Sequence, residues 1–252
     1  MKAISIILCA FILTGICAAE EPEYLDWKGS QLYNDKNYTG ALSYFSQAVS
    51  QDPNFLDAWI HKGNAQKALR DYNGSILSYN AALKINDSQA VAWSGIADAY
   101  TALKNYVNAS ATASKATELD NKNKGNWLKE GNLLQLQGKY KEAVAKYDAA
   151  LALDAEYKDA LYKKAISLIY EGKAVEAEKL IDQVLSIDPK YKLAHNAKGF
   201  IQEANGTIDE ALKSYDMALE IDPAYAQALN NKMHVLLALG KQKEAMQIFV
   251  KI

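Results

Sequence analysis

The sequence predicts an all-α fold, a solenoid of stacked helical hairpins, on three observations. Alanine, leucine and lysine are the commonest residues and favour helix over sheet. One amphipathic pattern recurs along the chain, as in GKYKEAVAKYDAALALD from Gly138 and TIDEALKSYDMALEID from Thr207. Half of the 252 residues are hydrophobic, which is enough for an extended core.

Residues 1–19 are expected to form a secretory signal peptide. Lys2 precedes an apolar run from Ala3 to Ile16, and the small residues 17–19 follow where a signal peptidase would cut. The run is shorter than the roughly 20 apolar residues of a membrane span, although an uncleaved anchor remains the alternative. We therefore expect an extracytoplasmic protein, secreted or attached to the cell surface, with no membrane span after removal of the signal.

Both cysteines, Cys9 and Cys17, lie inside this segment. The chain that follows it has no thiol, no disulfide and no thiolate metal ligand. Its stability must come from packing alone.

Residues 22–252 divide into units of 34 residues without any insertion or deletion. The units start at Pro22, Leu56, Ala90, Lys124, Lys158, Lys192 and Ala226, and the last one is truncated. Small residues dominate positions 8, 20 and 27 of the unit, whereas bulky ones dominate positions 4 and 24. This spacing lets two helix backbones approach closely while large side chains fill the space around them.

Each unit is expected to hold two helices with defined ends. Position 15 is glycine in the last four units (Gly138, Gly172, Gly206 and Gly240), where a left-handed residue would end the first helix. Proline at position 32 (Pro53, Pro189 and Pro223) would end the second helix.

These registers resemble those of the tetratricopeptide repeat family over residues 22–252. The resemblance implies helix-turn-helix units that stack into a right-handed superhelix with a concave groove. A hairpin of this kind buries its apolar face only against its neighbours, which explains why the pattern is repeated.

Two units depart from the common pattern. The third has Ala97, Ala113 and Thr117 where other units carry glycine or bulkier residues, and its second helix is rich in serine and threonine. We expect that helix to be the least stable part of the array. The seventh unit has no polar capping helix after it, so self-association through this end is a hypothesis.

Catalytic and metal sites are not predicted. The three histidines occupy different registers, and His195 falls at the core position 4, where a packed imidazole is favoured. No histidine pair has metal-ligand spacing, and there is no glycine-rich phosphate loop or nucleophile elbow. We expect no enzyme activity and no cofactor.

Nucleic-acid binding is also unsupported, because Arg70 is the only arginine and the sequence pI is about 6.0. The carboxylate clamp of chaperone-binding members of the family requires lysine, asparagine and arginine at set registers. The first units instead carry Asp26, Ser30 and His61, so that function is not transferred.

Five N-glycosylation sequons begin at Asn37, Asn73, Asn86, Asn108 and Asn205, whereas composition alone would give about one. All five fall at or near turns between helices. Turn preference for Asn, Gly, Ser and Thr is the alternative explanation, and the two remain open.

The concave groove is expected to be formed by positions 2, 5, 6, 9, 12 and 13. These positions are polar in the first units and largely apolar in the later ones, where residues 159–173 carry two apolar stripes. The groove residues predicted to bind an extended peptide are Leu128, Asn132, Tyr162, Ile166, Ile169, Tyr170, Asn196, Phe200 and Asn230.

The sequence therefore favours an exported, non-enzymatic module that binds a protein or an extended peptide in its groove. The alternative is a structural or assembly component of an envelope or cell-surface complex. Nothing in the sequence identifies the partner.

Overall fold

The structure is a computed structural model that describes residues 20–249, and the signal peptide expected at residues 1–19 lies outside them. Within that range the regular structure is entirely helical. The helices are α1 Pro22–Asn34, α2 Tyr38–Gln51, α3 Leu56–Ala68, α4 Tyr72–Ile85, α5 Ala90–Ala102, α6 Tyr106–Leu119, α7 Lys124–Leu136, α8 Tyr140–Leu153, α9 Lys158–Tyr170, α10 Ala174–Ile187, α11 Lys192–Ala204, α12 Ile208–Ile221, α13 Ala226–Ala238 and α14 Gln242–Phe249. Each helix packs against the next one along the chain, and the predicted all-α solenoid is confirmed.

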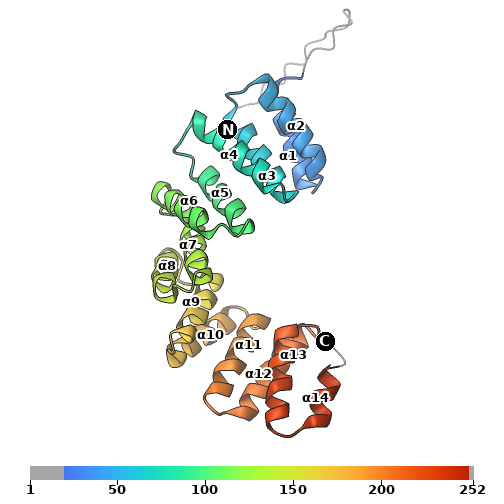
Figure 1. Cartoon of the computed structure of the whole chain (residues 1–252), viewed down its shortest axis with the longest axis vertical. Helices are drawn as coiled ribbons and strands as arrows, with labels where there is room; N and C mark the ends of the chain where they lie inside the picture. Colours follow the sequence, from blue (N-terminus) through green and yellow to red (C-terminus); the bar gives the residue numbers. More distant parts are fainter. Residues whose placement is uncertain (1–19, 250–252) are drawn as a thin grey trace, which may run out of the picture.

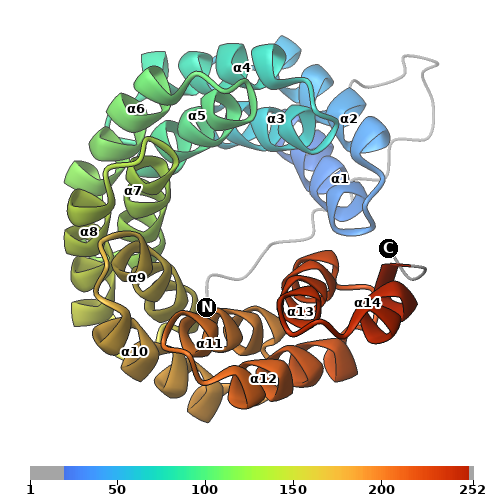
Figure 2. The ribbon, with the colours of Figure 1, turned by 60° about the horizontal axis from the view of Figure 1, so that its bottom comes forward.

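The hairpins stack into a curved superhelix (Figure 1). Seen from the end, the odd-numbered helices form the inner layer and the even-numbered helices form the outer layer (Figure 2). Odd-numbered helices one unit apart also touch, for example α9 with α11 and α11 with α13, so their exposed faces form one continuous inner wall. Among the described residues, every helix is too short or too polar to cross a lipid bilayer.

The core between the layers is built from rings of the outer helices packed on glycines of the inner ones. Tyr79 on α4 is fully buried, and a Cβ added at Gly63 or at Gly95 would lie only 2.7 or 2.4 Å from its ring. A Cβ added at Gly131 would likewise lie 2.4 Å from the ring of Tyr147. The small residues at position 8 therefore leave room for the ring of the outer helix, because a larger side chain there would displace that ring.

Position 4 anchors each of several units to the loop before it. The indole N–H groups of Trp59, Trp93 and Trp127 donate to the carbonyl oxygens of residues 53, 87 and 121 at 2.8–2.9 Å. His195 occupies the same register, is 9% exposed, and its Nε2 lies 2.8 Å from the Pro189 carbonyl oxygen. The prediction that this imidazole is a packed core residue is confirmed.

The turn after each inner helix contains one left-handed residue. Gly138, Gly172, Gly206 and Gly240 have φ between 73° and 80°, as predicted. The first three units make the same turn without glycine, since Lys36, Arg70 and Lys104 have φ of 61°, 63° and 59°. For a residue with a Cβ this conformation costs about 1–2 kcal/mol, so these three turns are strained.

Candidate functional site

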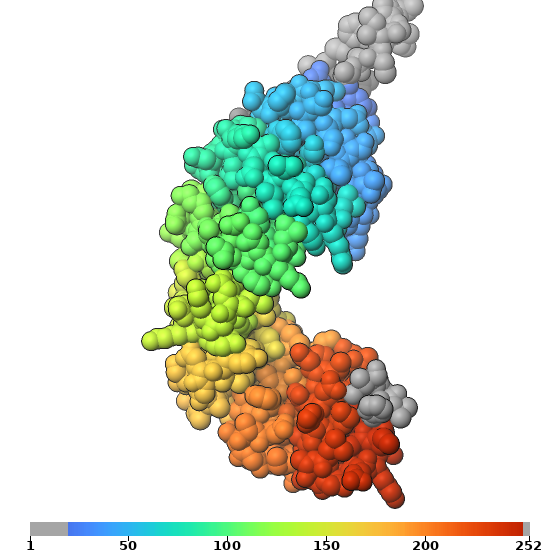
Figure 3. All heavy atoms as spheres, viewed as in Figure 1, coloured from blue at the N-terminus to red at the C-terminus, as the bar shows by residue number. Residues whose placement is uncertain are grey.

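A cavity of about 600 Å³ opens on the inner wall between α9, α11 and α13. Its lining residues are Tyr162, Ile166, Ile169, Tyr170, Asn196, Ala197, Phe200, Gln227, Asn230 and Asn231. The structure thus brings together all the predicted groove residues of these three helices. In the space-filling view the molecule is a curved body hollowed on one side (Figure 3).

The two predicted residues of α7 do not line this cavity. Leu128 is half-buried on the preceding inner helix. The Oδ1 atom of Asn132 accepts a hydrogen bond of 3.1 Å from the Tyr147 hydroxyl, which ties its amide to the core ring. Sequence registers could not reveal that this amide is already bonded.

The apolar part of the cavity consists of two kinds of side chain. Tyr170 and Phe200 are 65% and 47% exposed and form an apolar patch on the inner wall. Tyr162, Ile166 and Ile169 are half-buried and pack against the core cluster of the fifth and sixth units. The second apolar stripe predicted on α9 therefore lines the cavity, but three of its four side chains also pack against the core.

Tyr170 is held in place by a neighbour from the outer layer. Its ring stacks on that of Tyr140 on α8, with centroids 4.6 Å apart and an angle of 7° between the planes. Such a stacked pair fixes the orientation of an exposed ring and reduces the entropy that a ligand would have to remove.

Amide side chains form the opposite wall of the cavity. The Nδ2 atom of Asn231 on α13 donates to Oδ1 of Asn196 on α11 at 3.0 Å, and Asn230 lies exposed beside them. Gln227 and Ala197 complete the wall, and these two residues and Asn231 were missing from the predicted set. Their positions, 2 and 6 of their units, are groove registers, so the same register argument could have found them.

The cavity is electrically neutral, because none of its lining residues carries a charge. Burial raises the pKa of the Tyr162 hydroxyl above its ordinary value, and nearby tyrosines add to the shift. The phenol consequently stays protonated at physiological pH. The site can therefore offer apolar contact and uncharged hydrogen-bonding groups, and no counter-charge.

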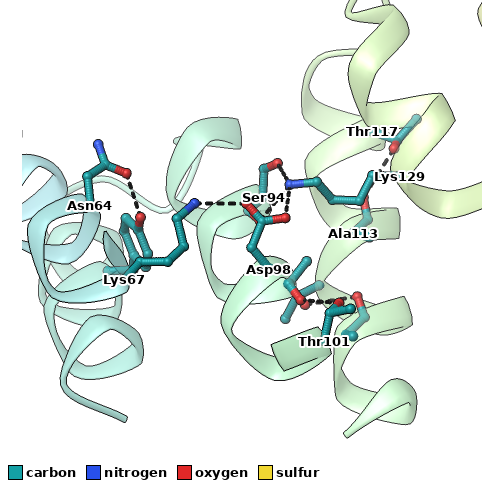
Figure 4. A network of polar contacts seen from close by, with 12 residues as sticks. Asn64, Lys67, Ser94, Asp98, Thr101, Ala113, Thr117 and Lys129 are labelled. Atoms are coloured by element: carbon teal, nitrogen blue, oxygen red, sulfur yellow. Dashed lines mark hydrogen bonds and ion pairs between the residues drawn. The ribbon is translucent and has the colours of Figure 1, made fainter. Parts of the chain in front are cut away.

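The inner wall of the first units has the opposite character. The carboxylate of Asp98 on α5 forms ion pairs with Lys67 of α3 and Lys129 of α7. The Nζ atoms of these lysines lie 2.8 and 2.5 Å from its Oδ2 and Oδ1 atoms (Figure 4). Lys129 also donates to the Ser94 hydroxyl and carbonyl, at 2.6 and 3.0 Å. One carboxylate thus links three successive inner helices beside a cavity of about 250 Å³.

The pKa values of this network reflect burial set against ion pairing. Burial opposes the charge of Asp98, but attraction by Lys129 and Lys67 prevails and lowers its pKa. Burial also opposes the charge of Lys67, whose pKa is nevertheless raised by Asp98. The pKa of Lys129 is lowered, because its burial outweighs the attraction of the shared carboxylate.

A second ion pair spans the first two units. His61 Nδ1 on α3 lies 2.8 Å from Asp26 Oδ1 on α1. This hydrogen bond raises the pKa of His61 above its usual value, although partial burial acts against it. The polar character expected for the first half of the groove is confirmed, but its ion pairs were not anticipated.

All five sequon asparagines are exposed. Asn37 and Asn86 use Oδ1 to accept backbone N–H groups of Gly40 and Ser88, both at 3.0 Å, so Nδ2 stays available as the glycan-bearing atom. The sequon of Asn73 differs, because the hydroxyl of its Ser75 is buried and donates to the Gly63 carbonyl at 2.9 Å.

Metal binding has no site in the part of the chain that the structure describes. No group of three or more His, Cys, Asp or Glu side chains between residues 20 and 249 is arranged to hold an ion.

Comparison with family models gives one consistent result. Models described as tetratricopeptide repeat match residues 28–91, 90–123 and 134–199. No match was found among curated proteins.

Solved structures with the same architecture are numerous. YrrB, described as a TPR protein with an unusual peptide-binding site, is 23% identical, with 75% of this chain and 97% of that chain covered and a TM-score of 0.62. MamA is 24% identical, with 66% and 96% covered and a TM-score of 0.60. A tetratricopeptide repeat protein from Parabacteroides merdae is 17% identical, with 91% of both chains covered and a TM-score of 0.76. At these identities the likeness concerns the fold.

Proposed function

The chain belongs to the tetratricopeptide repeat family, and on that premise we propose that it is an exported module that binds an extended peptide or protein segment in its groove. The observation that carries this proposal is the neutral cavity between α9, α11 and α13, with Tyr170 and Phe200 left exposed on it. Burial of each of these rings by a ligand would contribute about 1.5–3 kcal/mol. The matching models describe a repeat fold, and none describes an enzyme.

Capture of partners from a native extract, with groove variants, tests the proposal. Tyr170→Ser combined with Phe200→Ser should abolish capture and leave the helical circular dichroism spectrum unchanged, because both side chains are largely exposed. Ile166→Ser is a poorer probe, since its half-buried side chain also packs on the core.

Leu77→Ser combined with Val175→Ser is the matched control. These side chains are 71% and 67% exposed on the outer helices α4 and α10. Capture that survives the groove variant, or is lost equally in the control, would contradict binding in the groove.

Export is the part of the proposal that rests on residues 1–19. N-terminal sequencing of the protein from its native source should begin near Glu20. A mature cytoplasmic protein that retained Met1 would refute export.

Glycan attachment is tested on the same material by peptide mass mapping. If attachment follows folding, Asn37, Asn86, Asn108 and Asn205 should be modified in preference to Asn73, whose sequon hydroxyl is buried.

A second candidate, a structural component that assembles through its last unit, is favoured by one observation. Leu237 and Leu239, at the end of α13 and beside it, and Met246 on α14 are 51%, 46% and 67% exposed. A second copy of the chain is the proposed occupant. Sedimentation should then show a dimer that Met246→Glu dissociates, and a monomer at all concentrations would exclude this mode.

A further inference from the structure

The chemistry of the cavity between α9, α11 and α13 restricts what it can bind, beginning with charge. Its walls contain no acid and no base, whereas the cavity between α3, α5 and α7 contains Lys67, Asp98 and Asp120. A ligand carboxylate or ammonium group placed in the neutral cavity would lose its water and gain no counter-charge. This cavity should therefore bind peptides with charged side chains more weakly than peptides with uncharged ones.

The Asn196–Asn231 pair offers a defined hydrogen-bonding pattern. Asn231 donates one N–H to Asn196 Oδ1. The amide N–H groups of Asn196 and the side-chain carbonyl oxygen of Asn231 can therefore bond to a ligand. If the two amides were rotated together, the roles would exchange, and the pair would still present one donor and one acceptor. The two residues come from neighbouring inner helices, so the pattern exists only in the assembled array.

One donor beside one acceptor matches the main chain of an extended peptide. In an extended segment, the C=O and the N–H of one residue point to the same side, as they do where a strand exchanges two bonds with an antiparallel neighbour. Successive side chains alternate between the two faces of such a segment. A peptide bound to the amide pair could therefore place every second side chain against Ile166, Tyr170 and Phe200.

We propose that this site recognises an extended, uncharged peptide segment, with its main chain bound by Asn196 and Asn231 and large apolar side chains at alternate positions in the cavity. The inference rests on the proposed function and names the ligand class for the same groove. A site for acidic peptide tails would need cations on its walls. The cavity between α9, α11 and α13 has none among its lining residues, so the two kinds of site differ.

Fluorescence anisotropy with short labelled peptides, capped at both ends, tests the proposal on the purified chain. The probe alternates leucine with serine, and its variants replace the central leucine by phenylalanine, lysine or glutamate. A further variant replaces the amide N–H of the central residue by an ester oxygen. The leucine and phenylalanine peptides should bind, the lysine and glutamate peptides at least tenfold more weakly, and the ester several-fold more weakly.

Protein variants separate main-chain recognition from apolar contact. Asn196→Leu and Asn231→Leu should each weaken the leucine peptide about tenfold and remove the difference between amide and ester. Asn80→Leu, at an exposed position of the outer helix α4, is the control and should change neither.

The outcomes distinguish this inference from the proposed function. If the leucine peptide binds but the ester and both asparagine variants bind equally well, main-chain recognition is refuted while the groove remains a binding site. Equal binding of the glutamate peptide would refute charge selection. If none of the probes binds, this ligand class is wrong, and capture by the Tyr170 and Phe200 variants decides independently whether the groove has a partner.

Discussion

The first three units and the last four are built from the same kind of helical hairpin, but their ion pairs lie in different places. In the first three, polar contacts cross the inner wall, from His61 to Asp26 and from Lys67 to Asp98, and Asp98 also pairs with Lys129 on the first helix of the fourth unit. In the last four, lysines at position 7 of inner helices reach aspartates on the preceding outer helices. These pairs are Lys164–Asp148 at 2.6 Å, Lys198–Asp182 at 2.7 Å, and Lys232–Asp216.

The turns and caps differ between the same two regions. Asn37, Asp71 and Asn105 cap the outer helices of the first units with their side chains, and a strained non-glycine residue precedes each. In the later units glycine takes the left-handed position, and Lys139, Lys173 and Thr207 provide no side-chain cap.

The comparison shows that one repeat can build an inner wall whose polar groups are paired with one another, or an inner wall whose side chains are left for a ligand. Where ion pairs lie across the groove, they stabilise the array and occupy the polar groups that a ligand would need. Where the ion pairs lie between layers, the inner wall is left to apolar and amide side chains. The later units are therefore the half in which we propose that a ligand binds.

The largest expected change in stability comes from removing the buried ring of Tyr147, which has no counterpart in the third unit. Tyr147 is fully buried in the fourth unit, whereas Ala113 holds the same position in the third. Tyr147→Ala should lower the free energy of unfolding by about 3–5 kcal/mol, because it leaves a cavity against Gly131. Urea unfolding measures this, and Tyr140→Ala, a half-buried ring on the same helix, is the control. Equal losses in both variants would contradict the packing assigned to Tyr147.

The same difference should be visible without mutation, as unequal hydrogen exchange. The buried side chains of α6 are three alanines and Thr117, while α8 buries two alanines and the ring of Tyr147. The missing ring corresponds to about 1.5–3 kcal/mol of burial, so amides of α6 should exchange about ten to a hundred times faster than those of α8. Equal protection of the two helices would show that α6 is not the weakest part of the array.

Removal of the shared carboxylate should weaken the first half by a smaller amount. Asp98→Asn leaves Lys67 and Lys129 close together without their partner, and about 1 kcal/mol should be lost, since the 38% exposed aspartate is screened by water. The folded state lowers the pKa of Asp98, so its stabilisation is present above its ordinary value of 3.8 and disappears as pH falls through the folded value. The difference in unfolding free energy between wild type and variant should therefore shrink as pH falls below 3.8, and it should vanish only below the folded pKa of Asp98.

Exchanging the turn residues between the halves should produce opposite changes of similar size. Lys104→Gly removes left-handed strain and should stabilise the chain by about 0.5–1 kcal/mol. Gly138→Ala introduces the strain and should destabilise it by about 1 kcal/mol. Melting temperatures measure both, and Lys104→Ala should be close to neutral. A stabilisation by alanine equal to that by glycine would show that the lysine side chain, and not φ, causes the effect.

The smallest effect is expected for the ion pairs between layers in the second half. Asp182→Asn breaks the pair with Lys198, in which the aspartate is 53% exposed, and should cost only about 0.2–0.5 kcal/mol. The loss should vanish in about 1 M salt, where the Debye length is about 3 Å. A larger, salt-independent loss would mean that Asp182 has a packing role.

The sequence by itself determined the helices, their order and the buried registers. Position 8 predicted a close approach between helices at Gly63 and Gly131, and position 4 predicted the packed imidazole of His195. These features follow from the chain because a helix has a fixed period, and because each hairpin meets an almost identical neighbour at a fixed spacing.

Only the tertiary structure decided which polar groups meet across units. Asp98 pairs with one lysine 31 residues before it and another 31 residues after it, and Asn196 pairs with Asn231 at a separation of 35 residues. Each of these contacts depends on the rotation and curvature of adjacent inner helices, and on side-chain rotamers, to within about an ångström. A register places a residue on the inner wall, but the hydrogen bonds that occupy it or leave it free arise only when the units are stacked.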